Sequence, residues 1–272
     1  MERFESLAQQ LHPKPWVNYR EAATPRSHVW GHIYTSTEHD PQSPIFLHNE
    51  NSHVTSWAER LFFYCARAPA QGGETPIADC RRVYRDIDSE IVRKFETLGW
   101  QYVRTFGRNL GLPWQKALGL ETRAQVDAYC YENFMIPSWE GDTLRLRYKR
   151  WTAIDHPITA ERCWFNHGLF YNVWCLTPEQ KHFVQAFGVG RMPYNTAYGD
   201  GTAVPDEVLA AVHSAYAAAK TMFRWQSGDV LMIDNMLVCH EREAFVGDRA
   251  VYVGMTGPVS CQQVVTPDRY RL

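Results

Sequence analysis

The sequence predicts a mixed α/β fold that is mainly β, a double-sheet jelly roll with helices on its outside. Strand-like runs are spread along the whole chain, with a few helices between them and without the regular strand-helix alternation of a Rossmann or TIM fold. Composition does not shift along the 272 residues, and there are no internal repeats or flexible linkers. We therefore expect a single domain over residues 1–272.

Short apolar runs, most of them bounded by Gly-Asp or similar turn pairs, mark the expected strands. They cover residues 45–50, 143–149, 163–174, 230–233 and 250–255. In the first run a regular strand would place His48 and Glu50 on one face, because successive side chains alternate. An isolated His-x-Glu pair is ordinarily a strand that ends in a polar turn, so a metal site here needs a third ligand.

Two helices have clear boundary signals. Residues 177–188 offer Thr177 as N-cap, Pro178 at the first helical position, Gln180 at the capping-box position and Gly188 as the stop. Residues 205–223 repeat apolar side chains at steps of three and four, namely Val208, Val212, Tyr216, Ala219 and Phe223. This spacing predicts an amphipathic helix that packs against the sheets.

Charge and composition argue against some classes of binding partner. Basic residues number 28 and acidic residues 30, so the chain has no global field that would favour nucleic acid or an anionic membrane. The expected partner is a small-molecule substrate. The N-terminus lacks the apolar core of a signal peptide, and no run reaches the length of a membrane span. With seven cysteines that show no Cys-x-x-Cys spacing, we expect scattered reduced thiols and a cytoplasmic location.

The third ligand is expected near the C-terminus, where His240 follows the apolar strand 230–233. If that strand lies beside the run 45–50, His240 completes a two-histidine, one-carboxylate set with His48 and Glu50. Such a set occupies one face of an octahedral metal, leaves three positions open and suits non-heme Fe(II) oxygenases. A structural zinc site is normally closed by four protein ligands.

Several blocks in this order resemble the taurine dioxygenase-like (TauD/TfdA) family of Fe(II)/2-oxoglutarate-dependent oxygenases. Within that family, the branch of aspartyl-hydroxylase-like enzymes from syringomycin-type peptide clusters is the most similar. The blocks span nearly the whole chain and are jointly specific: IYTSTEHDP (33–41), HNENSH (48–53), QGGETPIADCRRVY (71–84), HPITAERCWFN (156–166), YGDG (198–201) and GDVLMIDNMLVCHEREAFVGDR (228–249). The resemblance implies a double-stranded β-helix (jelly roll) core and an enzyme that uses Fe(II), 2-oxoglutarate and O2.

The same resemblance implies roles for five residues. His48, Glu50 and His240 match the Fe(II) ligands, and Thr75 and Arg249 match the pair at the distal carboxylate of 2-oxoglutarate. The physical chemistry agrees for Arg249, because a planar guanidinium makes paired, charge-assisted hydrogen bonds to a carboxylate that lysine cannot reproduce. Without the resemblance, Arg249 would be read as a solvated charge and Thr75 as an ordinary turn residue.

Two departures from the family pattern bear on these expectations. Fewer residues precede His48 than this branch leads us to expect, and we therefore expect an N-terminal sheet element to be missing or replaced by a partner chain. Around His240 the chain reads CHERE where relatives have His-Gly-Arg, which affects the local backbone rather than the ligand. Family halogenases carry Ala or Gly at the carboxylate ligand. Glu50 fills that position here, which argues against halogenation.

The resemblance leads us to expect a hydroxylated product, with succinate and CO2 as coproducts. The substrate would be an amino acid or a related natural-product intermediate. Asn166 lies where relatives line the active site, although it could equally satisfy backbone groups. Arg147, on the basic face of the run 143–149, is our candidate for a substrate carboxylate, against the alternative of a solvated face. We interpreted His53 as hydrogen-bonded nearby and His167 as structural.

Desaturation or cyclisation with the same cofactors stays open as an alternative outcome. A zinc hydrolase built on the same triad is the alternative from a different class, but it lacks an HExxH helix and gives Thr75 and Arg249 no role. A binding protein that has lost its iron is disfavoured by the intact triad. The sequence also leaves open whether the substrate is free or tethered to a carrier protein, and whether the chain forms a homo-oligomer.

Overall fold

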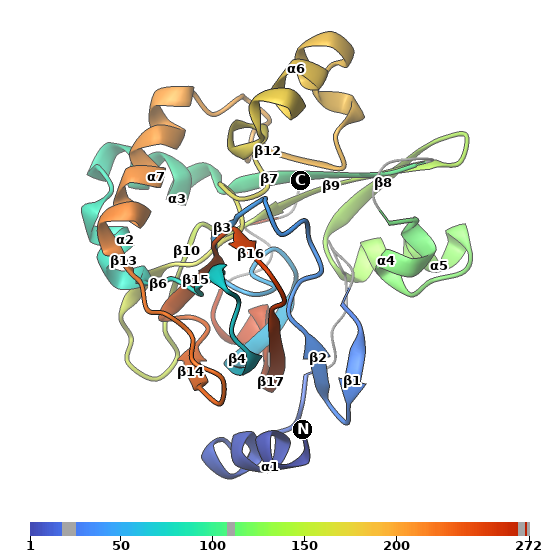
Figure 1. Ribbon diagram of the computed structural model, residues 1–272. Helices are drawn as coiled ribbons and strands as arrows, with labels where there is room; N and C mark the ends of the chain where they lie inside the picture. The colour runs from blue at the N-terminus through green and yellow to red at the C-terminus, as the bar shows by residue number, and fades with distance from the viewer. Residues whose placement is uncertain (18–25, 108–111, 266–269, 271–272) are drawn as a thin grey trace.

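The structure, a computed structural model, describes residues 1–17, 26–107, 112–265 and 270. Two sheets form its centre (Figure 1). The five-stranded sheet has the order β1-β2-β17-β4-β14: His28–Trp30, Ile33–Thr35, Ala250–Ser260, Ser56–Arg67 and Val230–Asp234. The four-stranded sheet has the order β13-β6-β15-β3: Lys220–Thr221, Ile77–Asp79, Val238–Arg242 and Ile45–His48. The predicted mixed, mainly β composition is confirmed at this level.

An apolar layer joins these two sheets. From the five-stranded sheet it contains Leu61 and Phe63 of β4 and Val253 of β17, and Ile77 and Val238 of the four-stranded sheet pack against it. The alternate residues of β4, Phe62 and Tyr64, pack in the cluster that contains helix α1 (Glu2–Leu11). Strand β4 is therefore buried on both faces, which explains its nearly continuous apolar sequence.

A third sheet carries much of the aromatic core. Its order is β12-β7-β9-β8: Tyr194–Tyr198, Trp100–Phe106, Thr143–Arg150 and Met135–Glu140. Two short pairs complete the strands, β10 with β11 (Ala153–Asp155, Arg162–Trp164) and β5 with β16 (Gln71–Gly72, Phe245–Val246). The buried side chains of β7 and β9, including Trp100, Tyr102 and Tyr148, belong to the largest apolar cluster.

The remaining helices cover the sheets from outside (Figure 1). They are α2 (Cys80–Asp86), α3 (Ser89–Leu98), α4 (Trp114–Leu118), α5 (Arg123–Glu132), α6 (Pro178–Phe187) and α7 (Asp206–Ala219), with 3-10 turns at Val173–Cys175, Val189–Arg191 and Cys261–Gln263. In the described part of the chain, no helix has the length and apolar character needed to cross a membrane. All seven cysteines are free thiols, as the sequence predicted.

Both predicted helices form, and one is shorter than expected. In α6 the capping box between Thr177 and Gln180 is present in both directions, and the helix ends at Gly188. Helix α7 ends at Ala219, because Lys220 and Thr221 leave the helix and pair with β6 as β13. Phe223 therefore lies beyond the helix, although its spacing continued the helical pattern.

The predicted strand 163–174 is wrong beyond Trp164. Only Arg162–Trp164 is a strand, and the chain then turns, with the Asn166 side chain accepting a hydrogen bond from the backbone N–H of Gly168 at 2.9 Å. Gly168 lies so close to Trp100 that an added Cβ would be 2.1 Å from the indole ring. This contact and the side-chain turn override the β propensity of the run.

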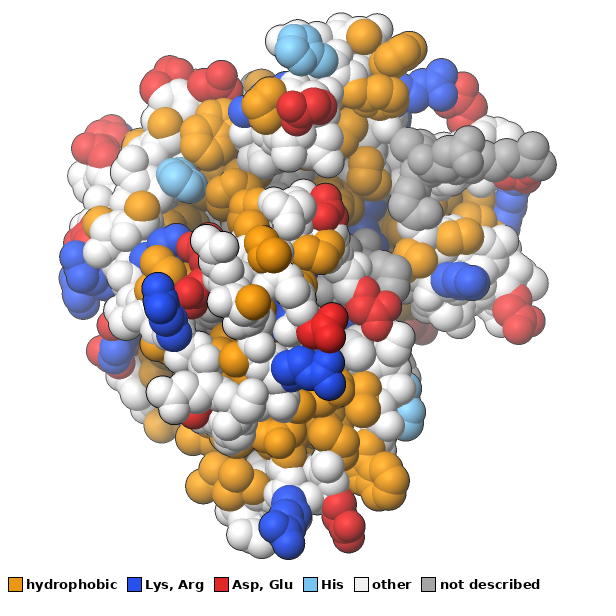
Figure 2. Space-filling model, in the orientation of Figure 1, with side chains coloured by type: hydrophobic (Ala, Val, Ile, Leu, Met, Phe, Trp, Pro, Cys, Tyr) orange, Lys and Arg blue, Asp and Glu red, His pale blue; other side chains and the backbone are white. Residues whose placement is uncertain are grey.

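Surface charges are mixed. On the face shown in Figure 2, Lys and Arg side chains are interspersed with Asp and Glu, and neither sign dominates. This agrees with the nearly balanced composition of the sequence.

Candidate active site

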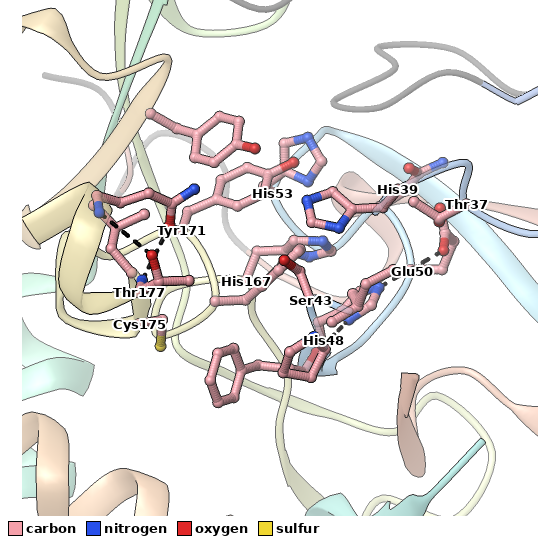
Figure 3. A pocket seen from close by; sticks show the side chains of 18 of the residues that line it. Thr37, His39, Ser43, His48, Glu50, His53, His167, Tyr171, Cys175 and Thr177 are labelled. Atoms are coloured by element: carbon pink, nitrogen blue, oxygen red, sulfur yellow. Dashed lines mark hydrogen bonds and ion pairs between the residues drawn. The ribbon is translucent and has the colours of Figure 1, made fainter. Parts of the chain in front are cut away.

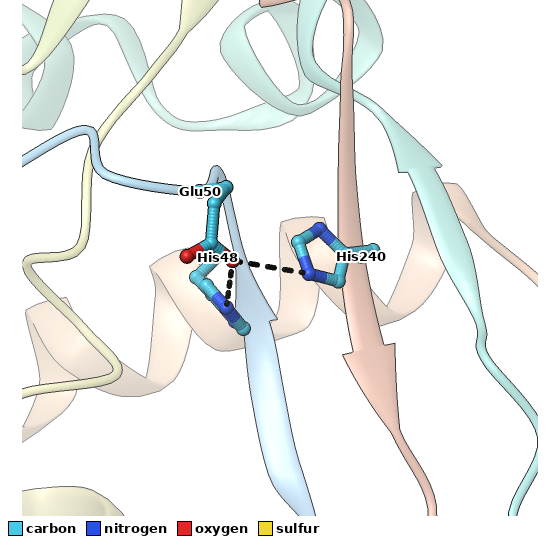
Figure 4. A group of neighbouring side chains, drawn as sticks. All are labelled: His48, Glu50 and His240. Atoms are coloured by element: carbon cyan, nitrogen blue, oxygen red, sulfur yellow. Dashed lines mark ion pairs between the residues drawn. The ribbon is translucent and has the colours of Figure 1, made fainter. Parts of the chain in front are cut away.

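Two histidines and one glutamate converge where β3 meets β15 (Figure 4). His48 and His240 are directly opposite each other in this antiparallel ladder. The His48 and His240 Nε2 atoms lie 4.0 Å and 3.8 Å from Glu50 Oε2. One ligand atom from each residue lies within 4.8 Å of the others, and all three side chains are buried. The three predicted ligands are therefore brought together.

The strand that lies beside β3 differs from the one expected. The run 230–233 forms β14, which pairs with β4, so it is not the neighbour of β3. His240 lies on the next strand, β15, and that strand pairs with β3. Glu50 also lies outside a strand, because β3 ends at His48 and the chain turns through Asn51 at φ 56°.

Asn235 fixes this turn. Its side-chain Oδ1 accepts from the Glu50 backbone N–H at 2.8 Å, and its Nδ2 donates to the Glu50 carbonyl at 2.9 Å and to the Ala58 carbonyl at 3.0 Å. Asn49 Nδ2 in turn donates to the Asn235 carbonyl at 2.7 Å. Asn235 therefore positions a candidate metal ligand from a distant part of the chain.

The donor set fits a divalent cation. His48 Nδ1 donates to the Phe46 carbonyl at 2.7 Å, because a carbonyl can only accept, so the lone pair of the neutral ring is on Nε2. Burial lowers the pKa of both His48 and His240, which keeps the rings neutral. Two imidazole lone pairs and a carboxylate thus face one another, an arrangement that a bound cation would stabilise.

Arg26 supplies a positive charge to this cluster. Its Nη2 donates to Glu50 Oε2 at 2.9 Å and to Thr37 Oγ1 at 3.3 Å, and the Arg26 and Glu50 side chains are only 5% and 6% exposed. The contacted oxygen is the same one that faces both histidines. Arg26 therefore shares with any metal the oxygen that the metal would bind.

Arg249 and Thr75 meet beside the triad, as the resemblance implied. Arg249 donates through Nη2 to Thr75 Oγ1 at 3.3 Å, through Nη1 to Ser36 Oγ at 3.2 Å and through Nε to the Gly73 carbonyl at 2.9 Å. Burial, with the nearby charge of Arg242, lowers the pKa of Arg249 to about 10. Trp225 Nε1 donates to Thr75 Oγ1 at 3.0 Å, a contact that the sequence did not predict.

Two cavities reach the triad. The larger, of about 310 Å³, is lined by His48 and Glu50 and extends past His53 and His167 towards Tyr171 (Figure 3). The smaller holds only about 30 Å³ and is lined by His48 and His240 together with Thr75 and Arg249. Arg26 lines both cavities, so its side chain stands at their boundary.

The two predicted substrate residues lie elsewhere. Asn166 is buried and uses its side chain on backbone groups, donating to the Thr152 carbonyl at 2.8 Å and accepting from Gly168, so it has the alternative, structural role. Arg147 is exposed on β9, on the face opposite to the buried Leu146 and Tyr148. It lines neither cavity at the triad. Its position matches the solvated basic face that we weighed against a substrate role.

Two histidines that were expected only to be structural or locally hydrogen-bonded line the larger cavity. His167 lines the larger cavity, because the chain turns at this point and does not continue as a strand, and its Nδ1 lies 2.8 Å from Ser52 Oγ. His53 lines the same cavity, and within the described part of the chain neither of its ring nitrogens has a hydrogen-bond partner. The nearby hydrogen bond expected for His53 is therefore not found among these residues. The single sequence signal for these residues was their closeness to other motif residues.

Comparisons with known proteins agree with this geometry. The family described as "Taurine catabolism dioxygenase TauD, TfdA family" matches residues 1–256. The dapdiamide synthesis protein DdaC of Enterobacter agglomerans is 36% identical over 260 residues, which are 95% of this chain and 79% of that protein. The chain belongs to the TauD, TfdA dioxygenase family.

Solved structures show the same fold at low identity. A taurine dioxygenase from Burkholderia xenovorans aligns with a TM-score of 0.51 at 14% identity, over 96% of this chain and 76% of that chain. PvcB from Pseudomonas aeruginosa aligns with a TM-score of 0.50 at 15% identity, over 93% and 70%. PvcB is described as an Fe, alpha-ketoglutarate dependent oxygenase from an isonitrile synthetic pathway.

The predictions of family and enzyme class are thereby confirmed. The protein is a dioxygenase whose cofactors are Fe(II) and 2-oxoglutarate, with O2 as cosubstrate, and it acts on a small molecule. The buried His48, Glu50 and His240 cluster has the donor types that Fe(II) requires.

Proposed function

We propose that this dioxygenase hydroxylates an unactivated C–H bond of an amino acid or a related small natural-product intermediate. The observation that carries the proposal is the His48, Glu50 and His240 cluster with the Arg249 guanidinium in the adjoining cavity. The name of the 36% identical relative, a dapdiamide synthesis protein, supports a natural-product substrate. Fe(II), 2-oxoglutarate and O2 together supply the oxidation, in which R–H becomes R–OH while 2-oxoglutarate becomes succinate and CO2.

In this proposal the protein's own residues ligate the metal, orient the cosubstrate and exclude water. His48, Glu50 and His240 hold the metal, and Asn235 holds the backbone of Glu50 in its turn. Thr75 and Arg249 bind the distal carboxylate of 2-oxoglutarate through charge-assisted hydrogen bonds. Because the smaller cavity has room for about one water molecule, the cosubstrate can reach Arg249 only if neighbouring side chains move. Arg26 is one of the residues that line both cavities.

We also propose a sheet architecture and a domain organisation for this chain. The five-stranded and four-stranded sheets with the apolar layer between them support a double-stranded β-helix (jelly roll) core, within one oxygenase domain over residues 1–272. Desaturation and cyclisation use the same cofactors and are alternative outcomes of the product analysis. Tethering of the substrate to a carrier protein and homo-oligomer formation are further outcomes to be measured.

Single-ligand variants test the metal assignment. We expect His48→Ala, Glu50→Ala and His240→Ala each to abolish substrate-coupled succinate formation and to lower bound iron severely, because loss of one ligand from a three-ligand site removes both affinity and geometry. His213→Ala is the matched control, since this half-buried histidine lines a different cavity beside α7. Circular dichroism would confirm that each variant is folded.

The substrate is identified by mass spectrometry of products from amino acids, offered free and carrier-bound, with iron, ascorbate and 2-oxoglutarate. Near-normal product formation by any one of the three ligand variants contradicts the metal assignment. Substrate hydrolysis that needs zinc and consumes no 2-oxoglutarate would instead indicate the hydrolase alternative.

A further inference from the structure

The larger cavity has an uneven distribution of charge. Among its described lining residues Glu50 is the only carboxylate, and it is already paired with Arg26 and directed at the metal position. The other polar groups in the lining are neutral or cationic, and at the end beyond the triad they include His53, Tyr171 and Tyr194. The described residues at that end therefore offer no carboxylate to a substrate cation.

His53 is the group in this lining whose hydrogen bonding is incomplete. It is 2% exposed, and neither Nδ1 nor Nε2 has a hydrogen-bond partner among the residues that the structure describes. Its ring centroid lies 4.7 Å from that of His167 and 5.1 Å from that of Tyr171, so aromatic rings hold its orientation. His167 is in turn 4.7 Å from His48, which places His53 one ring further from the metal position. Because buried polar groups are almost always paired, His53 points to a partner inside the cavity.

The electrostatic surroundings indicate what that partner is. Burial, together with the charges of Arg104 and Arg150, lowers the pKa of His53 well below its ordinary value, and these two arginines are 2% and 1% exposed. A neutral imidazole offers one N–H donor and one acceptor. Arg150 donates through Nε to the His53 carbonyl at 3.0 Å, which fixes this positive charge close to the ring. The resulting positive potential favours an oxygen anion over an ammonium group.

We propose that His53 donates a hydrogen bond to a carboxylate of the primary substrate, and that this end of the cavity selects anionic or zwitterionic substrates over cationic ones. The inference rests on the proposed oxygenase function and deepens it by naming the charge class of the substrate. The carboxylate that the sequence led us to expect at Arg147 is thus assigned to a different place. A substrate anchored at His53 would extend past His167 towards the metal position, which fixes the C–H bond that is presented there.

Binding measurements test the proposal without relying on turnover. The protein is loaded anaerobically with Fe(II) and 2-oxoglutarate, and the visible absorption of this complex is followed during ligand titrations. The probes are three matched series with the same side chains: N-acetyl amino acids, which are anionic, free amino acids, which are zwitterions, and amino acid amides, which are cationic. We expect at least one carboxylate-bearing probe to bind, and the amide with the same side chain to bind at least about tenfold more weakly.

Variants then connect this preference to His53. His53→Phe keeps an aromatic ring in place and removes both nitrogens, so we expect carboxylate probes to bind about 10- to 100-fold more weakly while the binding of amides changes little. His53→Gln should restore part of the preference, because its side-chain amide can donate. His213→Phe is the control with unchanged binding, since His213 lies in a different cavity.

The proposal is overturned if no carboxylate probe binds, or if amides bind as tightly as the matching acids. It is also overturned if His53→Phe leaves the preference for carboxylates over amides intact, which would mean that His53 contacts only water. If His53→Phe does not fold, the charge preference of the wild type and the His53→Gln variant decide the question. Failure to form the Fe(II) and 2-oxoglutarate complex at all would instead count against the proposed function.

Discussion

Replacing Arg26 with methionine should destabilise the metal-free protein far more than the metal-loaded protein. The Arg26–Glu50 pair is 2.9 Å long, and both side chains are at most 6% exposed, so the substitution leaves a buried carboxylate without its cation. Breaking such a buried pair costs about 3–5 kcal/mol. At about 2–4 °C per kcal/mol for a protein of this size, the Tm of the metal-free variant should fall by roughly 6–20 °C.

A bound divalent metal would replace the lost charge at Glu50. We therefore expect Mn(II) or Co(II) to recover most of this loss, so that the metal-induced rise in Tm is larger in Arg26→Met than in the wild type. Differential scanning calorimetry with and without metal measures both quantities. Arg67→Met is the matched control, because its pair with Asp248 is exposed at 65% and 84% and contributes about 0–1 kcal/mol. A fall in Tm that is equal with and without metal would refute the reasoning.

Two further predictions concern the cosubstrate and pH. Arg249→Lys loses the guanidinium fork that contacts Ser36 and Thr75. Because the charge-assisted hydrogen bonds of this fork are worth about 1.5–3 kcal/mol, we expect the KM for 2-oxoglutarate to rise about 10- to 100-fold. The KM for the primary substrate should change little. Steady-state kinetics with Arg67→Lys as control measures this, and equal effects on both substrates would point to a structural role. Burial holds the pKa of His53 and His167 well below 6.5, so below pH 6.5 the unfolded chain binds protons that the folded chain does not. In urea titrations of the metal-free protein, the free energy of unfolding should therefore fall as the pH falls below 6.5. The fall should be shallower in His53→Phe. A free energy of unfolding that does not depend on pH would contradict this prediction.

Local sequence patterns predicted features whose causes are local. The capping box of α6 follows from a short motif and is present. The pairing of Arg249 with Thr75, two residues far apart in the chain, was implied only by the family resemblance. The triad also converges, although the neighbouring strand was misidentified, because local patterns do not show whether β14 or the following strand β15 pairs with β3. Residue order alone could not give that sheet order.

Features that depend on distant contacts were missed or misjudged. The turn after Trp164 is set by the approach of Gly168 to Trp100, and these residues are far apart in the chain. Asn235 holds Glu50 across a similar separation. His53 could not be recognised as unpaired from sequence, because the absence of a partner is a property of the folded surroundings. For Arg147, strand alternation identified two faces of the strand but not which of them meets a cavity.

The cross-strand pairing of His48 with His240 has a consequence for folding. These residues come from distant parts of the chain, and their ladder is part of a sheet that also contains β6 and β13. Pairings with such large sequence separation close late, because the loop entropy must be overcome before the contacts are gained. Metal-binding capacity should therefore appear only after this ladder has closed. During refolding, the time course of Co(II) uptake would report when the two ends of the chain come together.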